Sequence, residues 1–117
     1  MSRRVNLLKE TLDMMKKHDL TESDIVYINV PRESYNEERK RYETENHFIT
    51  FDLFKRIANC EYDSGYGIAE VNTGLNILFT KGVMYREEYD GCEYWKYIEF
   101  HKDVKFDEND YDVELWI

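Results

Sequence analysis

The sequence has few of the residues that cross-link small secreted domains or that take part in catalysis. It contains two cysteines, one proline, five glycines and three histidines among 117 residues. Cys60 and Cys92 are too few and too far apart for a disulfide framework, and no Cys-x-x-Cys pair indicates a metal. The three histidines fall in unrelated segments, so no Ser-His-Asp or Cys-His arrangement is indicated. Our first expectation is a protein that is not an enzyme and has no cofactor.

Long apolar runs and an excess of basic residues are also missing. No run could span a bilayer and none has the form of a signal peptide, so we expect a cytoplasmic protein with reduced thiols. The chain has 16 Lys and Arg against 25 Asp and Glu, a net charge of -9. That charge disfavours direct contact with nucleic acid and favours a basic protein partner, although it could also serve only solubility.

The first half of the chain predicts a helix, a strand and a polar stretch within a single domain, residues 1–117. Apolar residues at three- and four-residue spacing predict a helix over residues 3–18. A β-branched run over residues 25–30, ended by Pro31, predicts a strand. Residues 32–46 carry mixed charge and almost no aliphatic side chain, so we expect a solvated helix or a long mobile connection. The apolar stripe of the first helix consists of Val5, Leu8, Leu12 and Met15, widened by Leu7 and Met14.

The second half predicts a short strand, a second helix and a meander. Residues 47–50 predict the strand, and Thr50 is the expected cap of a helix over residues 51–59. Residues 75–79 predict a mostly buried strand, followed by a two-residue turn at Lys81 and Gly82. Further predicted elements are a returning strand over 83–89, a type I′ turn at Asp90 and Gly91, a third strand over 93–100, and a final strand over 112–117.

These elements predict an α+β fold. We expect an antiparallel sheet built around the meander 75–100, with two helices packed on one face and with edge strands from residues 25–30, 47–50 and 112–117. The order of the edge strands does not follow from the sequence.

The predicted turn at Asp90 and Gly91 also fixes which residues face each other across the hairpin. Arg86 should lie opposite Trp95, a favourable cation–π pair, and Glu88 should lie opposite Glu93. Two like charges in this position are destabilising and require a cation. Three sources are possible: Arg86 of the same strand, a basic residue of a partner, or a divalent metal.

A loop with the sequence Glu-Tyr-Asp-Ser-Gly-Tyr-Gly precedes the meander at residues 61–67. With residues 75–79 and 88–95, it makes the chain resemble a group of small proteins of Firmicutes, their phages and mobile elements. The group pattern ends in Glu-Tyr-Asp-Gly-Ser-Glu-Trp-Trp, and this chain has Cys92 and Tyr94 where Ser and Trp are usual. The resemblance implies an origin in phages or mobile elements, and it implies no particular activity.

Small acidic proteins of phages and mobile elements look like inhibitors of host defence, and anti-CRISPR proteins are the best-known examples. Many occupy the nucleic-acid or PAM-reading groove of an RNA-guided nuclease, which is lined with Arg and Lys. We therefore expect a non-enzymatic, acidic inhibitor that mimics DNA and binds a basic nucleic-acid-handling protein, foremost a CRISPR effector nuclease. The expected contact residues are Glu61, Asp63, Tyr66, Glu88, Tyr89, Asp90, Glu93, Tyr94 and Trp95.

Two alternatives belong to other classes of protein. The first is a divalent-metal-binding domain or enzyme that uses Glu61 and Asp63 together with Glu88 and Glu93. The second is an accessory phage protein that only self-associates. A metal-dependent rise in melting temperature would indicate the first, and an oligomer without an outside partner would indicate the second.

Overall fold

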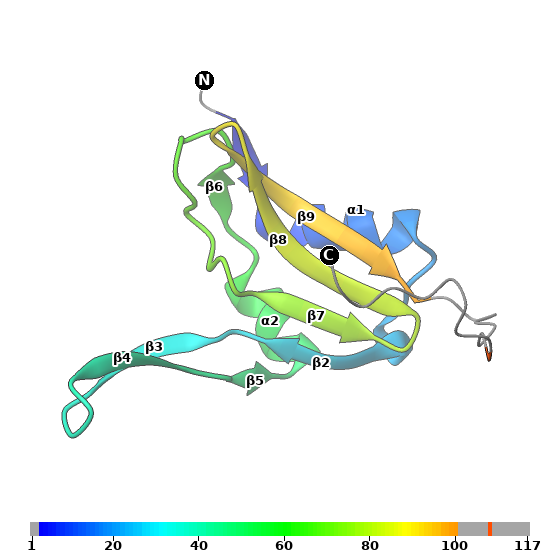
Figure 1. Cartoon of the computed structure of the whole chain (residues 1–117). Helices are drawn as coiled ribbons and strands as arrows, with labels where there is room; N and C mark the ends of the chain where they lie inside the picture. Colours follow the sequence, from blue (N-terminus) through cyan, green and yellow to red (C-terminus); the bar gives the residue numbers. More distant parts are fainter. Residues whose placement is uncertain (1–2, 101–107, 109–117) are drawn as a thin grey trace.

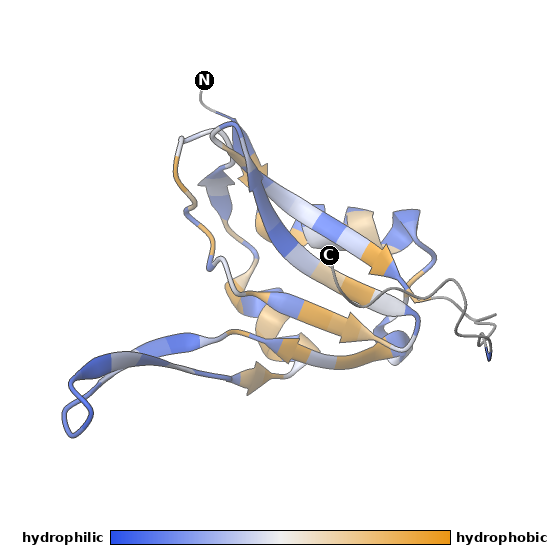
Figure 2. Cartoon of the chain, in the orientation of Figure 1, coloured by the Kyte–Doolittle hydropathy of each residue, from blue (hydrophilic) through white to orange (hydrophobic). Residues whose placement is uncertain are grey.

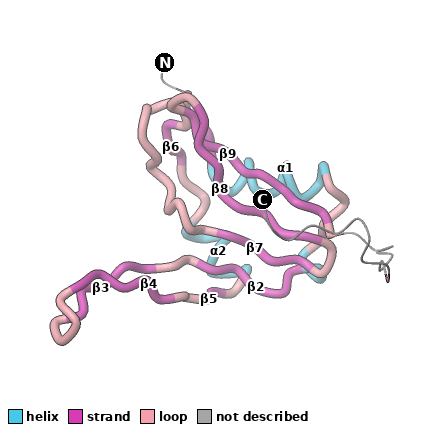
Figure 3. Tube along the Cα trace, viewed as in Figure 1, coloured by secondary structure: helices cyan, strands magenta, loops and turns pink. Residues whose placement is uncertain are grey.

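The computed structural model describes residues 3–100 and residue 108, and it has an α+β fold (Figure 1). Five antiparallel strands form the main sheet in the order β5-β2-β7-β8-β9. Both helices lie on one face of this sheet (Figure 3), which we call the inner face; the opposite face is the open face. The elements are β1 (Arg4–Asn6), α1 (Leu7–Lys17), β2 (Ile25–Asn29), β3 (Arg32–Asn36), β4 (Arg41–Glu45), β5 (Phe48–Ile49), α2 (Phe51–Ile57), β6 (Glu61–Asp63), β7 (Asn76–Phe79), β8 (Gly82–Tyr89) and β9 (Cys92–Glu99).

The meander β7-β8-β9 confirms the prediction made from the Asp90-Gly91 turn. Asp90 and Gly91 both have positive φ, 52° and 77°, as a type I′ turn requires. The observed register places Arg86 opposite Trp95 and Glu88 opposite Glu93. The core therefore forms on the inner face, where Ile77 and Met84 are fully buried.

Gly82 corrects one detail of this prediction. It is the first residue of β8, paired with Glu99, and not part of a two-residue turn. A Cβ atom at this position would collide with the Ile98 carbonyl oxygen and with the Tyr97 side chain. Close strand approach, and not turn geometry, is the reason for a glycine here.

The first helix starts later and faces the core differently than the apolar spacing predicted. Asn6 caps α1 by accepting a hydrogen bond from the Lys9 N–H (2.9 Å), and the three residues before Leu7 form β1 instead. The buried residues of α1 are Leu7, Thr11 and Met15. Leu12, which belonged to the predicted stripe, is 42% exposed because the helix is rotated toward Thr11.

The second helix follows its prediction more closely. Thr50 accepts a hydrogen bond from the Leu53 N–H (3.1 Å), which confirms the predicted cap. Phe54 and Ala58 belong to the core, whereas Ile57 is 54% exposed. The helix ends at Ile57, two residues before the predicted end.

Residues 32–45 form neither of the structures predicted for them. β3 and β4 pair in a separate two-stranded ribbon, which we call the arm, and it projects from the body (Figures 1 and 2). A turn with Lys40 at a φ of 51° closes it. The Asn36 side chain supports this turn by accepting hydrogen bonds from the N–H groups of Glu38 and Arg39.

The predicted final strand, residues 112–117, lies outside the described residues. Within the described part of the chain, no helix has the length and apolar character needed to cross a membrane.

Candidate functional site

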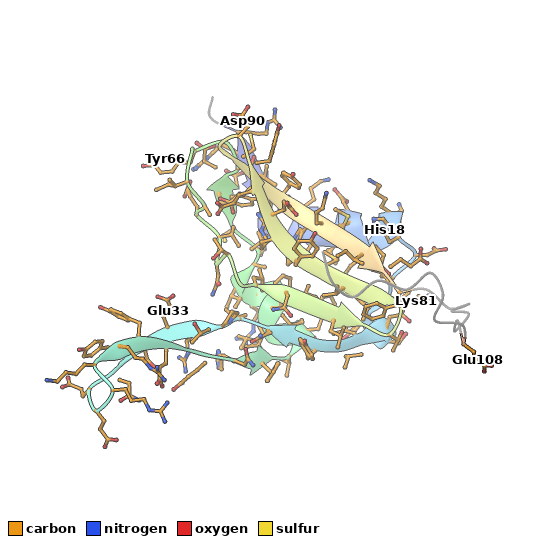
Figure 4. The ribbon with its side chains drawn as sticks, viewed as in Figure 1. His18, Glu33, Tyr66, Lys81, Asp90 and Glu108 are labelled. Carbon is orange, nitrogen blue, oxygen red and sulfur yellow. The ribbon has the colours of Figure 1, made fainter. Side chains whose placement is uncertain are left out.

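One end of the molecule gathers the loop that carries the Glu-Tyr-Asp-Ser-Gly-Tyr-Gly sequence, the β8–β9 turn and β1. We call this end the tip and define it as residues 3–4, 61–70 and 88–92. The Gly67 N–H donates to the Gly91 carbonyl (3.1 Å), which joins the loop to the turn. Between them lies a hollow of about 240 Å³, lined by residues 67–69 and 88–93. Figure 4 shows the labelled Tyr66 and Asp90 at this end, far from the arm.

The loop is shaped by its own polar residues. Asp63 accepts hydrogen bonds from the N–H groups of Arg3 (2.8 Å) and Gly65 (3.0 Å). Ser64 is buried, and both its N–H and its hydroxyl donate to the Arg3 carbonyl. Gly67 has a φ of 104°, which a side chain would strain. The backbone conformation of the loop thus explains why Asp63, Ser64 and Gly67 occur at these positions.

Large apolar side chains and carboxylates are exposed together on the tip. Tyr66, Ile68 and Tyr89 are 62%, 72% and 75% exposed. Glu88 and Asp90 flank Tyr89 and are also exposed. In the described part of the chain, neither carboxylate has an ion pair or a side-chain hydrogen bond. Aromatic side chains beside available charges are typical of protein interfaces.

Beneath the tip lies a buried polar network centred on Arg86. Its Nη2 atom donates to Glu93 (3.1 Å) and to the Tyr62 hydroxyl (2.9 Å), and its Nη1 atom donates to Glu10 (3.2 Å). Its guanidinium also lies over the rings of Tyr62 (5.4 Å) and Trp95 (5.0 Å). The cation that Glu93 requires is therefore Arg86, the first of the three sources considered. Glu88 has no ion pair in the described part of the chain.

Glu93 connects this network to the tip. Its carboxylate accepts the backbone N–H groups of Glu70 (2.6 Å) and Val71 (3.2 Å) as well as Arg86. One buried carboxylate thus fixes the end of the loop against the sheet. We infer that the tip is held in place before any partner binds.

The network also changes proton affinities. Burial is the main cause that raises the pKa of Tyr62, and the hydrogen bond that Tyr62 donates to Glu10 (2.7 Å) adds to it. Burial alone would lower the pKa of Arg86, but its contacts with Tyr62 and Glu10 more than offset this and raise it. Arg86 therefore stays charged and Tyr62 stays neutral over the ordinary pH range, since the pKa of each is raised.

The nine predicted contact residues differ in how far the structure exposes them to solvent. Five are exposed on the surface of the tip: Glu61, Tyr66, Glu88, Tyr89 and Asp90. Glu61 is paired with Arg4 at 3.9 Å, and the half-buried Asp63 lies on the same strand, β6. Tyr94 is half-buried on the open face, opposite Glu87.

Glu93 and Trp95 were wrongly assigned to a contact surface. They are only 4% and 2% exposed because inward positions of β9 face the helices. Trp95 donates its Nε1 hydrogen to Thr11 (2.9 Å), and Thr11 donates to the Leu7 carbonyl (2.7 Å). Both side chains are engaged inside the protein and not presented on its exposed surface.

Sequence reasoning missed Glu10, Thr11 and Tyr62 as members of the network. A signal was present, since Glu10 and Thr11 interrupt an apolar stripe between Leu7 and Met14. Polar residues on the buried side of a helix require partners, and the partners here come from strands far along the chain.

The acidic residues do not form a metal site in the described part of the chain. No three His, Cys, Asp or Glu side chains among these residues are grouped so as to hold an ion. Glu93, one of the four carboxylates considered for a metal, is already bound by Arg86. The metal-dependent alternative thus has no support from the geometry.

Comparisons of the chain with protein-family models, with curated proteins and with solved structures found no match in any of the three.

Proposed function

We propose that this protein is a non-enzymatic, acidic inhibitor that binds a basic nucleic-acid-handling protein through its tip. The observation that carries the proposal is the exposure of Tyr66, Ile68 and Tyr89 beside two carboxylates, Glu88 and Asp90, that have no ion pair in the described part of the chain. Aromatic side chains supply contact area at low entropic cost, and the carboxylates supply attraction to Lys and Arg.

A preformed tip makes such binding more favourable. Glu93 and the Gly67–Gly91 hydrogen bond hold the loop and the turn together in the free protein. A partner therefore loses little binding energy in ordering this surface. The acidic residues of the tip outnumber its two basic residues, Arg3 and Arg4, so its field attracts a basic groove.

The class of partner follows from the charge and from the resemblance described above. A groove that binds nucleic acid is lined with Lys and Arg and is open before nucleic acid arrives. We propose a CRISPR effector nuclease as the target, with the tip in the position that DNA or the PAM duplex would take.

The test is a DNA-cleavage assay with a panel of guide-loaded CRISPR nucleases, adding the protein before or after the target DNA. Inhibition only when the protein is added first supports occupation of the DNA groove. Inhibition in either order would contradict DNA mimicry and indicate a conformational block. No inhibition of any nuclease, with the protein in large excess, would overturn the proposed target.

A pair of matched variants locates the interface. The tip variant Glu88→Lys/Asp90→Asn should weaken inhibition by at least about 100-fold, because it removes two carboxylates and adds a repulsive charge. The arm variant Glu37→Lys/Glu38→Gln changes the net charge equally and should leave inhibition unchanged. Loss of inhibition in the arm variant alone would place the interface on the arm.

A further inference from the structure

The open face of the sheet carries an apolar band that crosses all five strands. Tyr27 lies opposite Leu78, Leu78 opposite Val83, and Val83 opposite Ile98. On the far strand β5, the ring of Phe48 contacts the ring of Tyr27 at 5.0 Å. Directly opposed residues point to the same side of a sheet, so these five side chains form one continuous row.

Nothing from the two helices covers this row, because both helices pack on the inner face (Figure 3). At its two ends, Phe48 and Ile98 are 56% and 52% exposed. The three central side chains are half-buried. Figure 2 shows the hydrophobic colour of β7 continuing into the neighbouring parts of β2 and β8.

The strand sequences indicate that this face is not built for water. A strand with one solvated face alternates apolar and polar residues. β7 instead has Ile77, Leu78 and Phe79 in succession, and β8 has Val83, Met84 and Tyr85. Apolar residues on both sides of central strands are typical of a sheet that is covered on both faces.

The charge of the open face is compatible with a second copy of this chain as the partner that covers it. Among the described strand residues on this face, the charged ones are Glu87 and Lys96, which have opposite signs. The chain as a whole has a net charge of -9, so two copies repel each other over most of their surface. The described strand residues of the open face therefore carry no net charge, and two copies can meet through them without like-charge repulsion.

We propose that two copies of this chain associate through their open faces, with the apolar bands packed against each other. Such an interface is isologous, the same patch being used twice, and resembles the face-to-face packing of a β-sandwich. Glu87 and Lys96 would lie at its rim, where a charged pair does not need to be desolvated. The inference is independent of the proposed function, because the tip is at another end of the molecule.

The test is the mass of the full chain in solution, measured by sedimentation equilibrium from about 1 to about 200 µM. We expect a dimer of twice 14.3 kDa that persists in high salt, because its contact is apolar. A monomer throughout this range would overturn the proposal. In that case, residues 101–117 or a different protein would be the remaining candidates to cover the open face.

Two matched substitutions show whether the open face is the interface. Ile98→Lys places a charge in the band and should raise the dimer dissociation constant at least about 100-fold. Ile57→Lys makes the same change at an equally exposed position of α2 and should leave the constant unchanged. Equal dissociation constants for the wild type and Ile98→Lys would overturn the proposal even if a dimer forms. Because Ile98 is half exposed, its substitution should preserve the monomer fold, which circular dichroism verifies.

Discussion

The molecule contains two antiparallel hairpins of opposite character, β8–β9 and the arm. Each is closed by a turn with a residue at positive φ, Asp90 and Gly91 in the first and Lys40 in the second. The first packs its inner face against α1, where Trp95 donates to Thr11. In the second, the hydrogen bonds, ion pairs and ring contact of β3 and β4 side chains stay within the arm among the described residues. Local turn chemistry can therefore form a hairpin, but only tertiary packing makes it part of the cooperative fold.

The ion pairs of the two hairpins also differ in how deeply their side chains are buried. In the Arg86–Glu93 pair the side chains are 2% and 3% exposed, and every partner is fixed by packing. In the arm, Arg39 and Arg41 both contact Glu43 at 3.3 Å; the two arginine side chains are 64% and 62% exposed and that of Glu43 is 32% exposed. A buried pair is costly to break, while an exposed pair contributes little to stability.

The largest expected effect comes from Arg86→Met. Removal of the guanidinium leaves the buried Glu93 and the partly buried Glu10 without a cation, so we expect a loss of about 3–5 kcal/mol in the free energy of unfolding. Urea denaturation followed by circular dichroism measures it. The double variant Arg86→Met/Glu93→Gln should recover part of the loss. A double variant less stable than Arg86→Met alone would show that the charge of Glu93 is not the cause.

A smaller effect is expected at the turns, where Gly91→Ala and Lys40→Ala form a matched pair. Gly91 has a φ of 77°, a backbone conformation that costs a residue with a Cβ about 1–2 kcal/mol. Gly91→Ala should lower the free energy of global unfolding by this amount. Lys40 already has a side chain and lies in the arm, so Lys40→Ala should leave global unfolding unchanged. Equal losses would show that the arm unfolds together with the body.

Tyr62→Phe tests the buried network through pH. The raised pKa of Tyr62 means that the folded state keeps this proton at pH values where the unfolded state loses it. Its contribution to stability is complete below about pH 10, the ordinary pKa of tyrosine, and is lost as pH rises above it. Thermal unfolding from pH 8 to about pH 11 should thus show a weaker alkaline loss in Tyr62→Phe than in the wild type. Tyr42→Phe, in the exposed arm, should behave as the wild type does.

The smallest effect is expected for Glu43→Gln in the arm. It removes both ion pairs of Glu43, which are exposed, and should change global unfolding by less than about 0.5 kcal/mol. Denaturation under the conditions used for Arg86→Met allows direct comparison. A loss above about 1 kcal/mol would mean that the arm contributes to the cooperative core.

The turns and caps that the sequence predicted well depend on few neighbouring residues. Asp90-Gly91 determines the β8–β9 register by itself, and Thr50 caps α2 whatever α2 packs against. The arm was missed because its turn has no glycine and its strands have almost no aliphatic side chain. The cross-strand contact of Tyr35 with Tyr42 becomes visible only when the two strands are paired.

The buried network could be predicted only in part for a related reason. The register gave the pairing of Arg86 with Trp95 and left the cation for Glu93 among three sources. The choice among them depends on Glu10 and Tyr62, which come from a helix and from a strand of another sheet. Their convergence is a property of the packed chain and not of any local pattern. For the same reason, the burial of Glu93 and Trp95 was misread as exposure.

The arm has a consequence for how this chain can evolve. Among the described residues, the side-chain hydrogen bonds, ion pairs and ring contact of the arm all stay within it. Most substitutions there should therefore leave the fold intact, and selection acts on them mainly through whatever the arm touches. The strands beneath the tip are different, because each change there must also satisfy the Arg86 network. The molecule thus combines a region of sequence that tolerates change, the arm, with one that is tightly constrained, the strands around Arg86.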